Sequence, residues 1–175
     1  RPEPGLVEFT GKGKTRIGFT NSSERIFAEY FVEKMIDAGI NATIEDNIQG
    51  AIFTKTIVNC ALNPLTAIHQ VKNGEVYNQP ELRDLATQLA TEAWNVAKAM
   101  NVTLTVDDPI DYTFEVIKRT GDNENSMLRD IRNKQKTEID FINGKIVFLG
   151  LKLGVTVTKN QEIYDKILTL EKSFS

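Results

Sequence analysis

The segment 46–62 constrains the fold of this 175-residue chain most strongly, because its apolar residues recur at helical spacing. They lie on nearly every side of the helix, which is typical of a helix buried in a core. Lys55 and Asn59 nevertheless share one stripe of that helix, and Asn63 follows at the same four-residue step. A buried ammonium without a partner is very costly. We therefore expect Lys55 to line a wet cavity, where it binds an anion or donates a proton, unless its stem merely extends into solvent.

A proline interrupts the same segment. Pro64 has no N–H, and its ring would clash with the carbonyl group of Cys60 in a continuous helix. We expect one helix to end near Leu62 and another to begin with Asn63 as its N-cap and Pro64 in its first turn. This interpretation explains Asn63 without any chemistry, while the cavity interpretation uses its amide as a donor and acceptor.

Helical patterns cover the chain from residue 21 onward. A first helix reaches Ala38 and stops at Gly39, with apolar residues predicted on its inner side. Those residues are Ile26, Phe27, Tyr30, Phe31 and Met35. Further helical segments are predicted at 80–100, 109–120, 126–132, 137–153 and 161–174. The fold class is therefore all-α, with one multi-helix domain over residues 21–175.

The first twenty residues read differently, as a β-hairpin with strands at 6–10 and 14–19 around a glycine turn. An isolated two-stranded hairpin is marginal in water, so we expect it to have belonged to a domain outside this chain. The chain starts at Arg1 without a methionine, as a fragment would.

The glycines of that turn do not predict a nucleotide site. A P-loop ending in Gly13-Lys14-Thr15 would need glycine where Glu8 stands, followed by a helix. A dinucleotide-binding pattern beginning at Gly11 would need its third glycine where Arg16 stands. We interpret the segment as a turn.

Composition excludes several classes of protein. The net charge is −3, with 21 Lys and Arg mixed among 24 Asp and Glu, which gives no basic footprint for nucleic acid. No apolar run reaches the ~20 residues of a membrane span. The single cysteine, Cys60, cannot form an internal disulfide, and with the single histidine, His69, it cannot build a four-ligand zinc site. We expect a cytoplasmic protein without a metal.

Three further polar residues are candidates for a second wall of the cavity. Ser126 starts a predicted helix, where its hydroxyl and free N–H groups suit a carboxylate, although it also reads as a simple N-cap. Glu138 falls in the first turn of another helix, where the helix dipole alone would favour it. Asn73 lies in a turn with Lys72 and Gly74, where a left-handed backbone conformation would explain it equally well.

Four segments together resemble one family, ketopantoate reductase or 2-dehydropantoate 2-reductase. They are KTIVNCALNPLTAI at 55–68, NGE at 73–75, SMLRDI at 126–131 and TEIDFINGKIV at 137–147. The resemblance covers the whole chain as that family's C-terminal half. It implies a helical domain of the 6-phosphogluconate dehydrogenase C-terminal-like type at 21–175, and it makes 1–20 the tail of an N-terminal Rossmann domain that is absent here.

The resemblance also implies an activity, the NADPH-dependent reduction of 2-dehydropantoate to pantoate on the route to pantothenate and coenzyme A. On this sequence Lys55 would be the general acid that protonates the C2 oxygen of the substrate. The pocket residues would be Asn59, Asn63 and Asn73, with Ser126 at the substrate carboxylate. Glu138 would lie near the ligand and cofactor and keep Lys55 charged if the two meet.

Other interpretations remain open at the level of sequence. A related reductase would act on another 2-keto acid, since the apolar lining of the pocket is not readable from the chain. A helical binding or dimerisation module would have lost catalysis. The expected partners are a small 2-keto acid, the N-terminal Rossmann domain and, as an option, a second copy in a homodimer.

Overall fold

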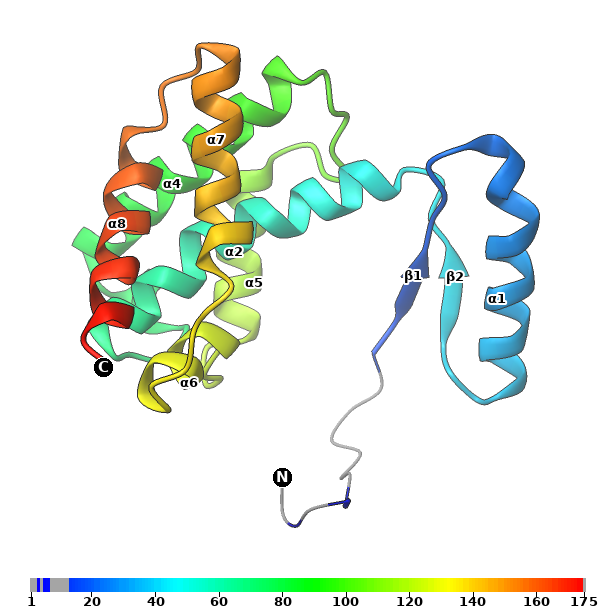
Figure 1. The fold of residues 1–175 in the computed structure, drawn as a ribbon, viewed down its shortest axis with the longest axis horizontal. Helices are drawn as coiled ribbons and strands as arrows, with labels where there is room; N and C mark the ends of the chain where they lie inside the picture. The colour runs from blue at the N-terminus through cyan, green and yellow to red at the C-terminus, as the bar shows by residue number, and fades with distance from the viewer. Residues whose placement is uncertain (1–2, 4, 7–12, 175) are drawn as a thin grey trace. The chain divides into compact units, whose positions relative to one another are not determined.

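The computed structural model describes residues 3, 5–6 and 13–174 (Figure 1). Its elements are β1 (Thr15–Ile17), η1 (Ser22–Glu24), α1 (Arg25–Asp37), β2 (Ala42–Ile44), α2 (Ile48–His69), α3 (Glu75–Asn78), α4 (Pro80–Ala99), α5 (Pro109–Arg119), α6 (Ser126–Arg132), η2 (Ile139–Phe141), α7 (Asn143–Leu153) and α8 (Thr158–Lys172). They form two compact units, residues 1–48 and 49–175. The expected helical class is confirmed.

The first unit is a small α/β arrangement. Strands β1 and β2 pair in parallel, with Thr15 opposite Ala42 and Ile17 opposite Ile44, and α1 packs against β2. The strand predicted at 14–19 thus exists, but its observed partner is β2, which follows α1 and was not predicted. The other predicted strand, 6–10, falls almost wholly outside the described residues.

The apolar side of α1 is open to solvent. Phe27 is 66% exposed and Phe31 is 59% exposed, and Ile26 and Tyr30 are exposed to a similar degree. The prediction that these residues lie on an inner side is therefore wrong for this chain, and Ala28 is the buried residue of the helix. Two three-residue strands offer too little surface to cover such a face.

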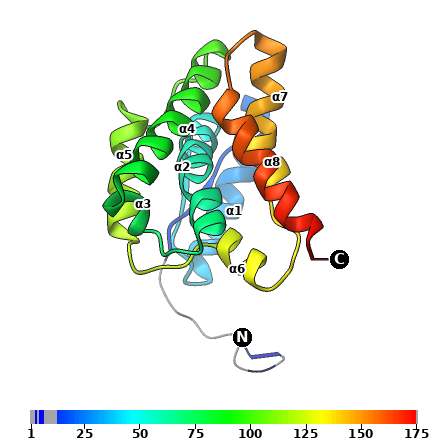
Figure 2. The same ribbon diagram turned by 90° about the vertical axis from the view of Figure 1, so that its left-hand side faces the viewer.

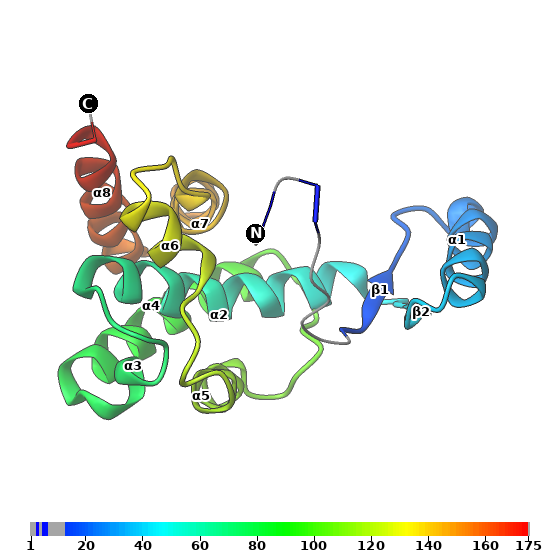
Figure 3. The ribbon, with the colours of Figure 1, turned by 90° about the horizontal axis from the view of Figure 1, so that it is seen from below.

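The second unit is built around α2. Figures 1 and 3 show α2 passing through the middle of the helices, with α5 on one side and α7 on the other. Helices α7 and α8 lie side by side and both contact α4 (Figure 2). Most buried residues of α2 lie from Ile57 onward, and Ile57, Leu65 and Ala67 are fully enclosed. The helices predicted after residue 80 appear, although the one expected at 137–153 divides into η2 and α7.

Helix α2 continues through Pro64, so the predicted break at Asn63 is wrong. A proline at this position removes the N–H that would bond to the carbonyl group of Cys60, four residues earlier. That carbonyl oxygen instead accepts a hydrogen bond from Nδ2 of Asn143, across 3.2 Å. Asn143 is fully buried and also donates to Oδ1 of Asn160 across 3.0 Å. Tertiary contacts thus replace the bond that the proline deletes.

Among the helices of the described residues, none is both long enough and apolar enough to cross a membrane.

Candidate functional site

The polar stripe of α2 runs from solvent into the core. Ile52 and Lys55 are exposed, Asn59 is half-buried, and Asn63 is only 5% exposed. The N-terminal half of α2 is therefore not buried all round. Because Lys55 is exposed, its charge does not carry the desolvation penalty of a buried ammonium. In the described part of the chain Lys55 forms no ion pair. The residue is exposed on the surface of this unit.

Ser126 and Glu138 lie within hydrogen-bond distance of each other. Ser126 is the first residue of α6, and its hydroxyl donates a 2.7 Å hydrogen bond to Oε1 of Glu138, the residue that precedes η2. The capping interpretation of Ser126 is wrong, because Asn125 holds that position and accepts from the N–H of Leu128. Ser126 is left exposed, with its hydroxyl on the carboxylate.

A second carboxyl group joins this pair. Asp130 lies one turn beyond Ser126 on α6 and is half-buried. Burial raises its pKa, and the charge of Glu138 and a hydrogen bond with it raise the pKa further. The sequence analysis missed Asp130, although its four-residue spacing from Ser126 was a usable signal. Three oxygen-bearing side chains therefore cluster where α6 meets the segment before η2.

Asn73 is held in a hydrogen-bonded network. Its Nδ2 donates to Oγ1 of Thr120 across 3.0 Å, and its Oδ1 accepts from Nδ2 of Asn125 across 3.1 Å. The side chain is 4% exposed. The left-handed conformation considered for Asn73 is not observed; near this turn the residue with positive φ is Gln70.

The network continues into α2. Asn125 also donates to the hydroxyl of Thr66, and that hydroxyl donates to the carbonyl oxygen of Asn63 across 2.8 Å. Asn63, Asn73 and Ser126 are thereby connected through Asn125, and Ser126 leads on to Glu138. Lys55 and Asn59 share the α2 stripe with Asn63. The structure does not pair Lys55 with Glu138.

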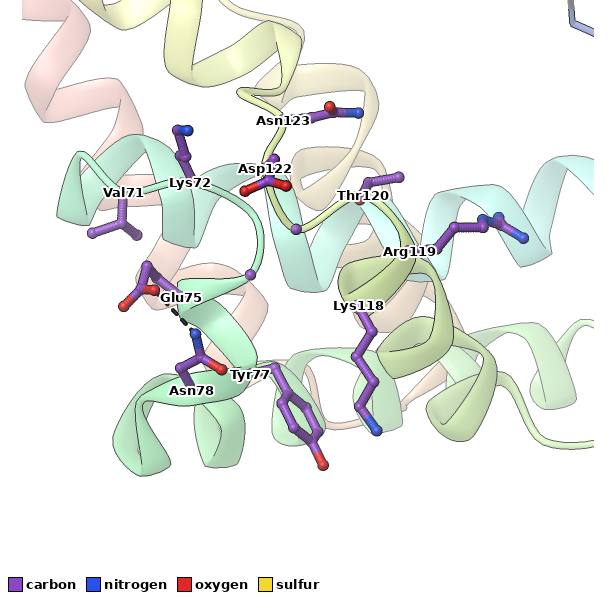
Figure 4. Close-up of a pocket in the computed structure, with 12 residues that line it drawn as sticks. Val71, Lys72, Glu75, Tyr77, Asn78, Lys118, Arg119, Thr120, Asp122 and Asn123 are labelled. Carbon is purple, nitrogen blue, oxygen red and sulfur yellow. Dashed lines mark hydrogen bonds between the residues drawn. The ribbon is translucent and has the colours of Figure 1, made fainter.

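A separate pocket of about 710 Å³ lies between the loops that follow α2 and α5. Figure 4 shows the side chains of Tyr77 and Lys118 next to each other, and the Lys118 Nζ lies 4.1 Å from the centre of the tyrosine ring. The side chains of Lys72 and Arg119 point in other directions. None of the six predicted site residues lines this pocket. Its cations do not converge, so it is not an obvious anion site.

Comparison with known proteins decides the family. The model of the family "Ketopantoate reductase PanE/ApbA C terminal" matches residues 47–171. This chain belongs to that family. The match includes α2, α6 and the segment around Glu138, and it confirms the resemblance inferred from the four sequence motifs.

Curated relatives carry the same name. The chain is 38% identical over 145 residues to a 2-dehydropantoate 2-reductase of Pyrococcus horikoshii, and 34% identical over 167 residues to one of Archaeoglobus fulgidus. These matches cover 83% and 95% of this chain but 48% and 56% of the relatives. The chain thus spans about half the length of the reductases it matches.

Solved structures share the fold. A family ketopantoate reductase from Ralstonia eutropha is 27% identical with a TM-score of 0.85, and the match covers 94% of this chain and 53% of that one. A D-mandelate dehydrogenase in complex with NADH is also 27% identical, with a TM-score of 0.90, and 99% and 60% of the two chains are covered. Nicotinamide-dependent oxidoreductases therefore occur among its structural neighbours.

Proposed function

We propose that this chain is the catalytic and substrate-binding half of an NADPH-dependent 2-dehydropantoate 2-reductase, acting in pantothenate and coenzyme A biosynthesis. The observation that carries the proposal is the exposure of Lys55, on the same helix stripe as Asn59 and Asn63. The match to a reductase family, and the relatives at 34–38% identity, support a catalytic role for that stripe.

Lys55 acts as the general acid. Reduction of a 2-keto acid adds a hydride to C2 and a proton to the C2 oxygen, so the oxygen needs a donor aimed at it. An ammonium stabilises the developing alkoxide before it gives up its proton. Such a positioned acid contributes ~10²- to 10⁴-fold in rate. Lys55 returns to its charged form by taking a proton from solvent.

The remaining residues bind and orient the substrate. Ser126, exposed at the start of α6, meets the substrate carboxylate by turning its one hydroxyl proton from Glu138 to the substrate. Asn59 offers its half-buried amide from α2. Asn63 and Asn73 have little exposed surface, so we assign them to the back wall of the pocket. Hydrogen bonds hold the side chain of Asn73 and the backbone carbonyl of Asn63.

The cofactor, when bound, supplies the hydride to C2. Within this chain we assign Glu138 to its side of the pocket, because a carboxylate has lone pairs beyond the one that Ser126 occupies, and these suit sugar hydroxyl groups. The glycines of this chain match neither phosphate-binding pattern. We therefore assign the pyrophosphate to the N-terminal domain.

That N-terminal domain is the proposed partner of the first unit. Parallel sheets are normally covered on both faces by helices, and two strands of three residues are below the size of a stable sheet. The exposed aromatic side of α1 would be covered in a larger α/β domain. Assembly as a homodimer is part of the same proposal, and light scattering of the complete enzyme measures it.

A second candidate is a reductase for a different 2-keto acid. The high structural similarity to D-mandelate dehydrogenase favours testing it. The deciding experiment is kcat/KM of the complete enzyme, with NADPH, for ketopantoate and for phenylglyoxylate. We expect a preference for ketopantoate of at least ~100-fold, because a pocket shaped for one side chain leaves polar groups unpaired with the other. The opposite preference would replace the leading proposal with the second.

A further inference from the structure

We infer that Asn125 is a positioning residue for the substrate site, holding Asn73 and the end of α2 in a fixed relation to Ser126. The inference rests on the proposed function, since Asn73 and Ser126 bind substrate there. Asn125 itself touches no reacting atom, and its role is to act through its neighbours.

The side chain of Asn125 is fully used. An asparagine amide has two N–H donors and one carbonyl acceptor. One donor bonds to the hydroxyl of Thr66 and the other bonds to Oδ1 of Asn73, while the carbonyl accepts from the N–H of Leu128. These partners belong to three different parts of the fold: α2, the loop after α2, and α6. One half-buried amide therefore links three segments. Thr66 lies 59 positions before Asn125, Asn73 lies 52 positions before it, and Leu128 lies on the helix that it caps.

Asn125 determines which way the amide of Asn73 faces. The oxygen of Asn73 accepts from Asn125 and its nitrogen donates to Thr120, so an inverted amide would place two donors face to face at Asn125. The backbone strengthens this arrangement, because Gly74 N–H donates to the carbonyl oxygen of Gly121 across 3.0 Å. A Cβ atom at Gly74 would approach the Cα atom of Gly121 to 3.1 Å, so the two loops meet at glycine. The second N–H of Asn73 is then the one free to point at a ligand.

The link to α2 is equally directed. Thr66 is fully buried, and its single hydroxyl proton goes to the carbonyl oxygen of Asn63, so its oxygen must accept from Asn125. Asn125 also sets the start of α6 as its N-cap, which places Ser126 as the first helical residue. An ordered site of this kind binds more tightly because its groups lose little freedom when the ligand arrives.

The test is Asn125→Asp, which keeps the capping oxygen and the shape but removes both N–H donors. A matched control is Asn21→Asp, the same change at another N-cap, where the side chain accepts from the N–H of Ser23. In the complete reductase we expect Asn125→Asp to raise KM for ketopantoate ~10-fold or more with kcat changed less than ~3-fold, as for lost uniform binding. The control should leave both constants unchanged.

A second readout does not depend on the substrate. In ¹H–¹⁵N spectra of the 175-residue chain, Asn125→Asp should move the side-chain amide signal of Asn73, and Asn21→Asp should not. An unmoved Asn73 signal would overturn the inference. So would a moved signal with an unchanged KM for the 2-keto acid that the enzyme reduces. If the wild-type enzyme prefers another 2-keto acid, the proposed function fails while the amide signal and that acid's KM still test Asn125.

Discussion

The side-chain amide of Asn143 donates to the carbonyl oxygen of Cys60, and that carbonyl is the one that Pro64 leaves without a helical partner. The cost of a proline within a helix therefore depends on a residue about 80 positions further along the chain. Asn143 belongs to the motif TEIDFING, which is thus partly a structural support for α2.

Stability measurements can isolate this relationship. Asn143→Ala should lower the free energy of unfolding by ~1–3 kcal/mol, because it leaves the carbonyl of Cys60 buried and unpaired. In a Pro64→Ala background the restored N–H of residue 64 bonds to that carbonyl, so the same substitution should cost less. Urea unfolding of the four proteins gives the coupling, which we expect to be at least ~0.5 kcal/mol. Equal costs in both backgrounds would contradict the compensation.

Removal of Lys55 should affect chemistry more than binding. In the complete reductase Lys55→Ala should reduce kcat for ketopantoate by ~100-fold or more, because the C2 oxygen loses its proposed proton donor. Lys152→Ala, at an exposed lysine of α7, is a matched control that should leave kcat unchanged. Turnover close to that of the wild type without Lys55 would remove it from the mechanism.

Ser126→Ala should act on substrate affinity. The substitution removes the hydroxyl proposed to meet the substrate carboxylate, so KM should rise by ~10-fold while kcat falls less. The variant also releases the carboxylate of Glu138 from its 2.7 Å hydrogen bond. Steady-state kinetics over a range of ketopantoate concentrations separates the two constants, and a fall in kcat with unchanged KM would argue against the carboxylate assignment.

The carboxyl pair of Asp130 and Glu138 should change how the stability of the chain depends on pH. Because the pKa of Asp130 is raised, the folded chain binds its proton more tightly than the unfolded chain does. Stability is therefore reduced at neutral pH and recovers as the pH falls through the raised pKa towards the ordinary value of 3.8. Asp130→Asn should stabilise the chain slightly at pH 7, by less than ~1 kcal/mol, and lose that advantage near pH 4. A constant difference in melting temperature across this range would contradict the pairing.

The isolated chain should fold and yet reduce no ketopantoate. Holding a nicotinamide against the substrate carbon supplies ~7–11 kcal/mol of the barrier, and the sequence of this chain matches neither phosphate-binding glycine pattern. Purified chain, NADPH and ketopantoate would be followed at the nicotinamide absorbance, with the complete reductase as the positive control. Turnover comparable to the complete enzyme would mean that the cofactor site lies within these residues.

Periodicity was sufficient to predict most helices, because apolar spacing alone defines the face of α4 or α8 that meets the core. It failed at Pro64, where a local rule about helix breaking was outweighed by the tertiary contact from Asn143. It also failed for α1: the apolar face was visible in the sequence, but whether anything in the chain covers that face is a property of the fold.

The candidate site divides in the same way. Lys55, Asn59 and Asn63 share a helix, so their common stripe follows from spacing alone. Ser126 and Glu138 were chosen separately, and the 2.7 Å bond between them is a result of the fold. Asn125 was overlooked because its partners Thr66 and Asn73 lie far away in sequence, and its local pattern indicated nothing beyond a helix start.

The buried thiol of Cys60 can report local unfolding of the core around α2. Cys60 is fully enclosed in the middle of α2, and burial raises the pKa of its thiol, so a thiol reagent cannot attack it in the closed fold. It is also the single cysteine of the sequence. The rate at which a thiol reagent labels Cys60 in the wild-type chain therefore measures how often the core around α2 opens, without any engineered residue.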